Sequence, residues 1–303
     1  MYDIIIIGSG PAGLTAAIYS SRATLKTLVI SGASWGGQLM LAEKVENYPG
    51  FKEGILGPDL MKIIYKQAEH FGAEMLFENA SAVDFSSKPF KIWVGDKKYE
   101  GRSVIIATGA SAKWLGLDSE KRLRGKGVSI CATCDAAFFK DKRTVVVGGG
   151  DTAMEEALTL SKFANEVKIV HRRDKLRASK ALQERVFKNP KIGIIWNSIV
   201  KEILGEEKVK GVILKKVDSN EKIELKCNAV FIAIGYKPNT EIFKGKLELD
   251  QRGYIIAKDM TKTNVEGVLV AGDVEDYNYR QAITAAGAGC KAALDAERFL
   301  GEI

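Results

Sequence analysis

Proline is scarce in this 303-residue sequence, and long apolar runs are absent from it. Six prolines stand against 30 glycines, a ratio that favours a fold built on tight glycine turns over a linker-rich or disordered chain. No stretch of about 18 consecutive apolar residues exists, so we expect no membrane partner. The apolar residues Ile4 to Ile7 follow the N-terminus almost at once, without a basic leader. We therefore expect a cytoplasmic protein.

Cysteine and histidine are also few. Two of the four cysteines are close neighbours, Cys131 and Cys134, and the other two, Cys227 and Cys290, are isolated. This is not the pattern of a disulfide framework in a secreted protein. A structural zinc site needs four ligands at fitting spacing, and the chain has only two histidines. We expect no metal, and we expect the isolated cysteines to be buried and inert.

Acidic residues are outnumbered, with 45 Lys and Arg against 38 Asp and Glu. A net charge of +7 favours anionic partners in general. Nucleic-acid binding would call for basic residues interleaved with aromatic ones, or for a recognised binding module. The sequence has neither, so we expect no nucleic acid. Nucleotide phosphates and an acidic protein are the remaining kinds of partner.

A glycine motif follows the first apolar run directly. Gly8, Gly10 and Gly13 stand between that strand-like run and a segment with helical apolar spacing. In this context the motif predicts a dinucleotide cradle, with glycines for a tight turn, for close approach of a pyrophosphate and for helix packing. An NAD site would have an acidic residue at the end of the next strand, where Ser31 and Gly32 stand instead. This cradle is therefore predicted to hold FAD through other contacts.

A second glycine motif follows the valine-rich segment 144–147. Gly148, Gly150 and Ala153 repeat the spacing of the first motif, and alanine is permitted at the third position. About twenty residues on, the next strand-like segment ends in basic residues, which suit a ribose 2′-phosphate and so favour NADPH over NADH. A solvated basic face is the alternative. The basic residues are His171, Arg172, Arg173 and Arg177.

The paired cysteines lie between the two glycine motifs. Cys131 and Cys134 are separated by two residues and followed by Asp135. A metal site and an inert structural pair are possible interpretations, but the spacing also permits a small reversible disulfide ring at a helix start, where a thiolate is favoured. Asp135 is a candidate proton relay. Its alternative role is that of a carboxylate at the beginning of a helix.

Apolar strand-like segments alternate with helical ones throughout the chain. This predicts an α/β fold with two Rossmann-like, three-layer nucleotide-binding domains, one for each glycine motif. Their strands include segments 104–106, 230–234 and 268–270, each of which ends in small residues.

Taken together, the motifs make the chain resemble the low-molecular-weight thioredoxin reductases, within the pyridine nucleotide-disulfide oxidoreductase family. The resemblance covers nearly the whole length, and the joint order of its motifs is more specific than any one of them. They are residues 8–13, 36–39, 46–50, 107–110, 131–135, 148–151, 171–174, 271–273 and 279–282.

The resemblance implies an FAD domain made of residues 1–113 and 244–303, with an NADPH domain, residues 114–243, inserted into it. It also implies a homodimer. Together with the glycine motifs it implies cofactor-binding residues in both domains. For FAD these are Gly8, Gly10, Pro11, Ala12, Gly13, Gly37, Gln38, Leu39, Asn47, Thr108, Gly109, Asp273, Arg280, Gln281 and Ala282, and for NADPH they are Gly148, Gly150, Asp151, Thr152, His171, Arg172, Arg173, Arg177 and Gly235.

The same resemblance implies a reaction. Electrons would pass from NADPH through FAD to a Cys131–Cys134 disulfide and on to thioredoxin. Cys134 would face the flavin, Cys131 would attack the thioredoxin disulfide, and Asp135 would handle the proton. Members of this family rotate one domain against the other, and the expected hinges are residues 111–117 and 236–243. The basic segment 121–126 is either a docking site for an acidic thioredoxin or a solvated loop.

Three related enzymes and one binding protein are the rivals. Alkyl hydroperoxide reductase flavoproteins are similar but carry an extra N-terminal thioredoxin-like region. Reductases that take electrons from ferredoxin lack the basic cluster at Arg172 and Arg173, and ferredoxin–NADP reductases lack the cysteine pair. A nucleotide-binding redox sensor would need no reactive dithiol.

Overall fold

The computed structural model describes residues 1–42 and 44–301 and divides the chain into two compact units. The first unit consists of Met1–Ser111 and the segment from Lys237 onward, and the second of Ala112–Tyr236. The predicted inserted domain extends seven residues further, to residue 243. Residues 237–243 pack in the first unit, where Phe243 is fully buried and stacks on Phe85 with 6.4 Å between ring centroids.

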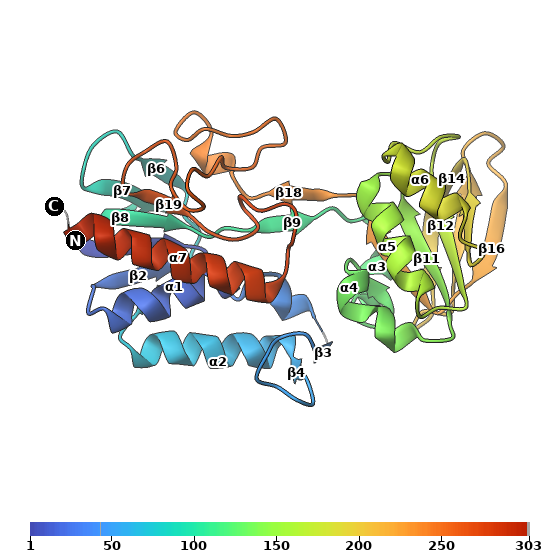
Figure 1. The fold of residues 1–303 in the computed structure, drawn as a ribbon, viewed down its shortest axis with the longest axis horizontal. Coiled ribbons are helices and arrows are strands. Elements are labelled where there is room, and N and C mark those ends of the chain that lie inside the picture. Colours follow the sequence, from blue (N-terminus) through green and yellow to red (C-terminus); the bar gives the residue numbers. More distant parts are fainter. Residues whose placement is uncertain (43, 302–303) are drawn as a thin grey trace. The chain divides into compact units, whose positions relative to one another are not determined.

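The first unit is built on a seven-stranded sheet with the strand order β5-β2-β1-β8-β7-β6, and β19 pairs with β8 (Figure 1). Strands β5, β2, β1, β8 and β19 pair in parallel with one another, whereas β7 is antiparallel to β8 and β6 is antiparallel to β7. The bounds are β1 (Tyr2–Ile7), β2 (Thr27–Ile30), β5 (Glu74–Leu76), β6 (Ala82–Asp84), β7 (Phe90–Val94), β8 (Lys97–Ile106) and β19 (Val268–Val270).

The two faces of this sheet are covered differently. On β1, Ile4 and Ile6 pack with the helices α1 (Pro11–Arg22), α2 (Gly57–His70) and α7 (Ala282–Gly301). Ile5 and Ile7 point to the other face, because side chains alternate along a strand. There they pack with residues of β7 and of the segment that begins at Lys237. Both faces are therefore buried, which explains the unbroken apolar run.

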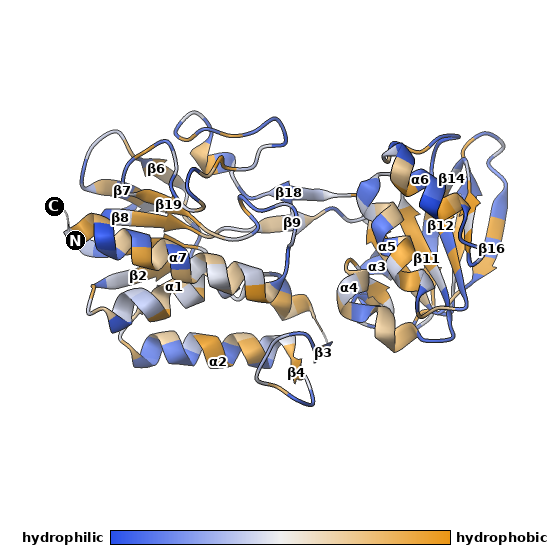
Figure 2. Ribbon diagram, in the orientation of Figure 1, coloured by the Kyte–Doolittle hydropathy of each residue, from blue (hydrophilic) through white to orange (hydrophobic). Residues whose placement is uncertain are grey.

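The second unit has a five-stranded parallel sheet with the order β10-β17-β11-β12-β13. Helices α5 (Asp151–Ser161) and α6 (Lys180–Phe187) pack on one face, and the antiparallel sheet β14-β15-β16 packs on the other. The central strands of both units are apolar (Figure 2). The bounds are β10 (Val128–Ser129), β11 (Arg143–Gly148), β12 (Glu166–Val170), β13 (Ile192–Ile195), β14 (Ser198–Leu204), β15 (Gly211–Lys216), β16 (Lys222–Lys226) and β17 (Ala229–Ala233). The predicted α/β fold with two Rossmann-like sheets is confirmed.

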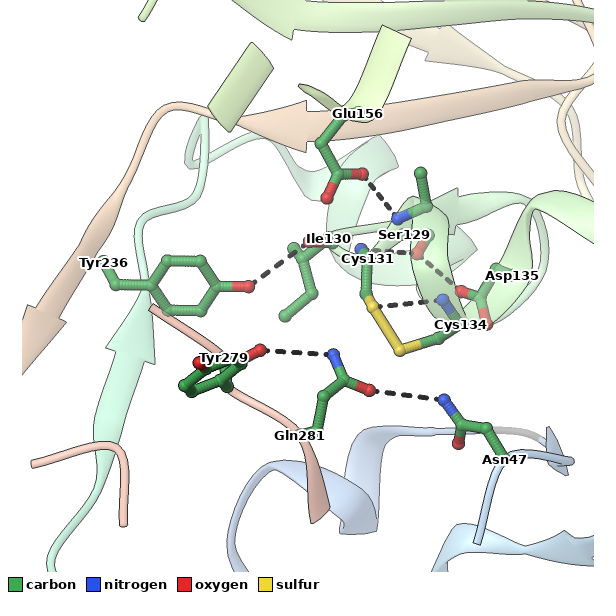
Figure 3. Close-up of a disulfide and its surroundings, with 11 residues drawn as sticks. Asn47, Ser129, Ile130, Cys131, Cys134, Asp135, Glu156, Tyr236, Tyr279 and Gln281 are labelled. Carbon is green, nitrogen blue, oxygen red and sulfur yellow. Dashed lines mark hydrogen bonds between the residues drawn. A yellow bond between two sulfur atoms is a disulfide. The ribbon is translucent and has the colours of Figure 1, made fainter. Parts of the chain in front are cut away.

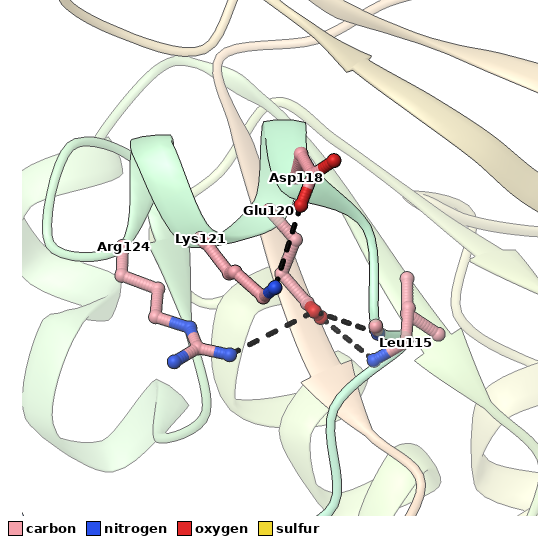
Figure 4. A network of polar contacts seen from close by, with 6 residues as sticks. Leu115, Asp118, Glu120, Lys121 and Arg124 are labelled. Carbon is pink, nitrogen blue, oxygen red and sulfur yellow. Dashed lines mark hydrogen bonds and ion pairs between the residues drawn. The ribbon is translucent and has the colours of Figure 1, made fainter.

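The chain passes between the units twice, along the paired strands β9 (Ala110–Ala112) and β18 (Tyr236–Pro238). Directly after β9, Glu120 of the short helix α3 (Asp118–Leu123) fixes the incoming loop (Figure 4). Its fully buried carboxylate accepts the backbone N–H groups of Leu115, at 2.8 Å, and of Gly116, at 3.0 Å. A buried carboxylate needs such donors. The second half of the predicted hinge 111–117 is thus anchored to the second unit.

The described helices differ from membrane spans in length and composition: none of them is both long and apolar enough to cross a bilayer.

Candidate active site

The predicted cysteine pair forms a disulfide in the second unit. Cys131 is the N-cap of the four-residue helix α4 (Ala132–Asp135), and Cys134 lies within it, 5.3 Å away between Cα atoms. The N–H of Cys134 donates to Cys131 Sγ at 3.2 Å (Figure 3). Cys134 is exposed and Cys131 is half-buried. An exposed two-residue loop of this kind is open to thiol–disulfide exchange.

Polar groups surround the segment 129–135, which we call the redox turn. The Ser129 hydroxyl donates to Asp135 Oδ2 at 2.5 Å and accepts the N–H of Cys131 at 3.1 Å. Asp135 is therefore joined to the backbone of Cys131 through a single hydroxyl (Figure 3). The N–H of Ala132 donates to the carboxylate of Glu156, which belongs to α5. Neither Ser129 nor Glu156 was predicted, because no spacing rule links them to the cysteines.

The two remaining cysteines are unpaired. Cys227 is buried, as predicted, and its burial raises the pKa of the thiol to about 12. Such a thiol stays protonated and unreactive at neutral pH. Cys290, on α7, is half-buried, so its predicted burial is only partial.

The first glycine cradle lies at the carboxyl end of β1. A Cβ atom on Gly8 would come within 2.2 Å of the Ala107 carbonyl oxygen, and one on Gly13 within 2.0 Å of the Gly8 carbonyl oxygen. A Cβ atom on Gly10 would meet nothing within 4 Å. Gly10 is also the N-cap of α1 and offers no side chain to its free N–H groups. Backbone packing therefore requires two of these glycines, and the third opens onto space that suits a pyrophosphate.

Other predicted FAD residues meet this cradle. Ser9 Oγ donates to the Ser31 carbonyl oxygen at 2.9 Å and accepts the N–H of Gly36 at 3.0 Å. This brings the segment that contains Gly37, Gln38 and Leu39 to the cradle, where a Cβ atom on Gly37 would lie 3.2 Å from the Gly10 Cα. Ser9 had no predicted role.

Asp273 follows β19, beside β8, so it lies at the same sheet edge as the cradle. Burial, with the nearby charge of Asp276 second, raises the pKa of its carboxyl to about 6. A half-buried carboxylate favours ligand hydroxyl groups as partners, which is the chemistry of a ribityl chain.

Two further predicted positions are also brought together in the first unit. Asn47 Nδ2 donates to Gln281 Oε1 at 3.3 Å, and the Gln281 amide donates to the Tyr279 carbonyl oxygen at 3.3 Å (Figure 3). The Thr108 hydroxyl, by contrast, donates to the carbonyl oxygen of Asn239 at 2.8 Å. Asn239 in turn donates its amide to the Thr108 carbonyl oxygen at 2.8 Å. It was not predicted as part of the site.

The second cradle lies at the carboxyl end of β11. A Cβ atom on Gly148 would come within 2.3 Å of the Ala233 carbonyl oxygen, whereas one on Gly150, the N-cap of α5, would meet nothing within 4 Å. Gly235, after β17, likewise faces open space. The side chain of Asp151, at the start of α5, accepts the N–H of Ser179 at 2.7 Å. This cradle fits a dinucleotide for the same reasons as the first.

The basic residues near the second cradle divide into two kinds. His171 is buried, and a Cβ atom on Gly149 would lie 2.2 Å from its ring. Its Nε2 is 3.0 Å from the Lys175 carbonyl oxygen, and burial lowers the pKa of the imidazole. The side chains of Arg172, Arg173 and Arg177 are exposed, and the backbone N–H of Arg177 donates to the Gly149 carbonyl oxygen at 2.8 Å. The ring therefore supports the cradle, while the guanidinium groups are available to a phosphate.

Within the described residues, no group of three or more His, Cys, Asp or Glu side chains is arranged to hold a metal ion.

Known proteins similar to this chain share both its length and its fold. A thioredoxin reductase of Rickettsia conorii is 54% identical over 304 residues, which span 99% of this chain and 98% of the relative. One of Streptomyces clavuligerus is 53% identical over 99% of this chain and 94% of its own length. The solved thioredoxin reductase of Streptococcus pyogenes MGAS5005 has a TM-score of 0.96 and 41% identity, covering 100% of this chain and 99% of that one. That of Giardia duodenalis has a TM-score of 0.95 and 47% identity, with 99% of each chain covered.

A family model described as pyridine nucleotide-disulphide oxidoreductase matches residues 2–289. This description agrees with a disulfide and two nucleotide-type cradles in one chain. With the full-length relatives, it establishes that the chain belongs to the pyridine nucleotide-disulphide oxidoreductase family.

Proposed function

We propose that this chain is a flavoprotein thioredoxin-disulfide reductase that takes its electrons from NADPH. The observation that carries the proposal is the Cys131–Cys134 disulfide, which lies in one unit with a glycine cradle flanked by exposed arginines. A second cradle of the same type lies in the other unit. The relatives described above are thioredoxin reductases along their whole length.

Each unit is assigned one cofactor. FAD would be held in the first unit by the cradle around Gly10, the segment from Gly37 to Leu39, and Asp273. NADPH would be held in the second unit by the cradle around Gly150, with Arg172 and Arg173 on its 2′-phosphate. Bound together, the two cofactors would supply a hydride and pass its two electrons to a disulfide.

The redox turn would then carry out the exchange with the client. The Cys131–Cys134 disulfide takes up two electrons and two protons and becomes two thiols. The thiolate of Cys131 attacks one sulfur of the client disulfide, and a mixed disulfide forms as the other client sulfur leaves with a proton. Cys134 displaces the second client sulfur and closes the original disulfide. Asp135, which is linked to the turn through Ser129, would hold a proton during these steps.

The basic segment 121–126 makes internal contacts, which bear on its predicted role in docking the client. Lys121 pairs with Asp118 at 3.3 Å, and Arg122 donates to the Gly205 carbonyl oxygen at 3.0 Å. The Arg124 guanidinium lies 3.7 Å from the centre of the Trp114 ring. These internal contacts favour the alternative of a solvated loop. A homodimer and a cytoplasmic location are further parts of the proposal. The homodimer follows from the resemblance, and the location from the four cysteines, which do not form the disulfide framework of a secreted protein.

Replacing one cysteine at a time tests the function. Cys131→Ser and Cys134→Ser are each expected to lower NADPH-dependent reduction of thioredoxin by about three orders of magnitude, because each removes a covalent partner of the exchange. NADPH should still bleach the flavin band of Cys131→Ser in anaerobic stopped-flow mixing. Cys290→Ser is the matched control and should turn over normally. Full thioredoxin turnover by Cys131→Ser would contradict the proposal, and absence of flavin bleaching would favour the sensor alternative.

A further inference from the structure

The carboxylate of Glu156 contacts the redox turn from a different element. Glu156 lies on α5, the helix that begins at the second cradle, and accepts the N–H of Ala132, the residue after Cys131 (Figure 3). This polar contact lies beside an otherwise apolar contact between the turn and α5. Ala132 and Ala136 of the turn region are buried with Met154 and Ala157 of α5. Glu156 itself is half-buried, so its charge is only partly screened by water.

Two neighbouring N–H groups of the redox turn therefore have different partners. The N–H of Cys134 donates to Cys131 Sγ at 3.2 Å, and such a bond stabilises a thiolate once the disulfide is reduced. The N–H of Ala132 donates to Glu156 instead. A carboxylate bonded to the N–H that follows Cys131 disfavours a negative charge on the nearby Cys131 sulfur. Glu156 thus opposes the effect of the Cys134 N–H.

We propose that Glu156 is a positioning residue for the redox turn, which holds the start of α4 and keeps the Cys131 thiol less acidic than its N–H donor would make it. A less acidic thiol is a stronger nucleophile once ionised and makes the dithiol a stronger reductant. The inference rests on the proposed redox role of Cys131 but not on the identity of the client.

Two other titratable groups face the same turn. Asp135 is bonded to Ser129, and the Tyr236 hydroxyl donates to the Ile130 carbonyl oxygen at 3.3 Å. Neither of these two residues is replaced in the Glu156 variants. A pH profile that moves in a Glu156 variant is therefore assigned to that carboxylate.

The test measures the reactivity of Cys131 in the holoenzyme, reduced with dithiothreitol and freed of it. Alkylation of Cys131 by iodoacetamide is followed by peptide mass spectrometry across the pH range in which thiols titrate. Glu156→Gln keeps an acceptor oxygen and loses the charge. Its alkylation midpoint is expected to fall by about one pH unit, with several-fold faster labelling below the midpoint. Glu224→Gln, the same change at an exposed position on β16, should leave the midpoint where it is.

Glu156→Ala removes the hydrogen-bond acceptor for the Ala132 N–H as well as the charge. Comparing it with Glu156→Gln therefore separates the role of Glu156 in holding the start of α4 from the effect of its charge on Cys131. It should show the same shift in midpoint and also a several-fold lower kcat with the client at an unchanged KM for NADPH. Alkylation midpoints that agree among wild type, Glu156→Gln and Glu224→Gln would overturn the inference. Because the reduction is chemical, a shifted midpoint in an enzyme that fails to reduce thioredoxin would support the role of Glu156 and reject the proposed client.

Discussion

The residue between the first two glycines differs between the two cradles. In the first unit it is Ser9, whose hydroxyl joins the end of β2 to Gly36. In the second unit it is Gly149, and the buried ring of His171 occupies the space where its side chain would be. In both units a side chain thus connects the end of a strand to the glycine turn. In the first unit it is the Ser9 hydroxyl, which belongs to the turn, and in the second it is the His171 imidazole, which belongs to the strand end.

The difference bears on the proposed assignment of one cofactor to each cradle. His171 is followed by Arg172 and Arg173, so the residue that braces the turn also positions exposed cations beside the second cradle. In the first cradle the strand end reads Ser31 and Gly32, and no charge is present there. We infer that one short segment, residues 171–173, both supports the glycine turn through His171 and provides the preference for a 2′-phosphate through its arginines.

The largest expected effect concerns the first glycine of the motif, which both cradles share. In Gly8→Ala and Gly148→Ala the new methyl group would meet a backbone oxygen at 2.2 Å and 2.3 Å. Backbone cannot move aside cheaply, so each change should cost roughly 3 kcal/mol or more of stability. Urea unfolding and cofactor retention measure it: Gly8→Ala should lose FAD, and Gly148→Ala should keep FAD and lose NADPH binding. Gly245→Ala, with open space around it, should cost less. Equal losses of both cofactors in both variants would show that the cradles are not independent.

The next effect concerns the exposed arginines, which only the second cradle has. Replacing Arg172 and Arg173 by Gln should raise the KM for NADPH by roughly 10- to 100-fold, because charged hydrogen bonds to the 2′-phosphate are lost. The KM for NADH and the FAD content should not change. Steady-state kinetics with both nucleotides measure this, with Arg185→Gln, at an exposed position of α6, as control. Equal losses with NADPH and NADH would reject the 2′-phosphate assignment.

A third experiment tests the imidazole brace. Gly149→Ala should cost about 2 kcal/mol, since the methyl group and the His171 ring compete for one space. In the His171→Ala background the same change should cost little, which a double-mutant cycle of urea unfolding would show. Ser9→Gly is the matched change in the first cradle. Additive costs at Gly149 and His171 would mean that the ring does not brace the turn.

The smallest expected effect is a pH dependence of opposite sign in the two units. Burial raises the pKa of Asp273 to about 6, above its usual 3.8, so the folded first unit binds a proton before the unfolded chain does and gains stability as the pH falls from about 6 toward 4. Burial lowers the pKa of His171 below its usual 6.5, so the second unit loses stability as the pH falls through about 6.5.

The signs of these two contributions are the prediction. Urea unfolding of the FAD-free full-length chain, compared with Asp273→Asn and His171→Gln, measures them. Asp273→Asn should remove the gain in acid, and His171→Gln should remove the loss. A wild-type slope that neither variant changes would contradict both assignments.

Local sequence patterns predicted much of this site. A β-branched strand, a glycine turn and a helix are adjacent in the chain, so the cradles at Gly8 and Gly148 follow from short-range preferences. The Cys131–Cys134 disulfide was predictable for the same reason. Glu156 was not, because 24 residues separate it from Ala132 and only packing of α4 on α5 joins them.

Other features also depended on tertiary contacts. His171 was grouped with the arginines because the sequence shows a basic cluster, and only the fold shows that its ring is buried while theirs are exposed. The end of the inserted unit near Tyr236 is set by the packing of Phe243 on Phe85, which are far apart in the chain.

The sequence by itself determined the two cradles, the α/β class and the reactive pair, since each depends on residues close together in the chain. The tertiary structure decided which groups surround that pair and which basic residues remain exposed. The physical reason is that burial and hydrogen bonding depend on segments brought together only when apolar faces pack. The polar groups around Cys131 are therefore determined by the packing of α4 on α5.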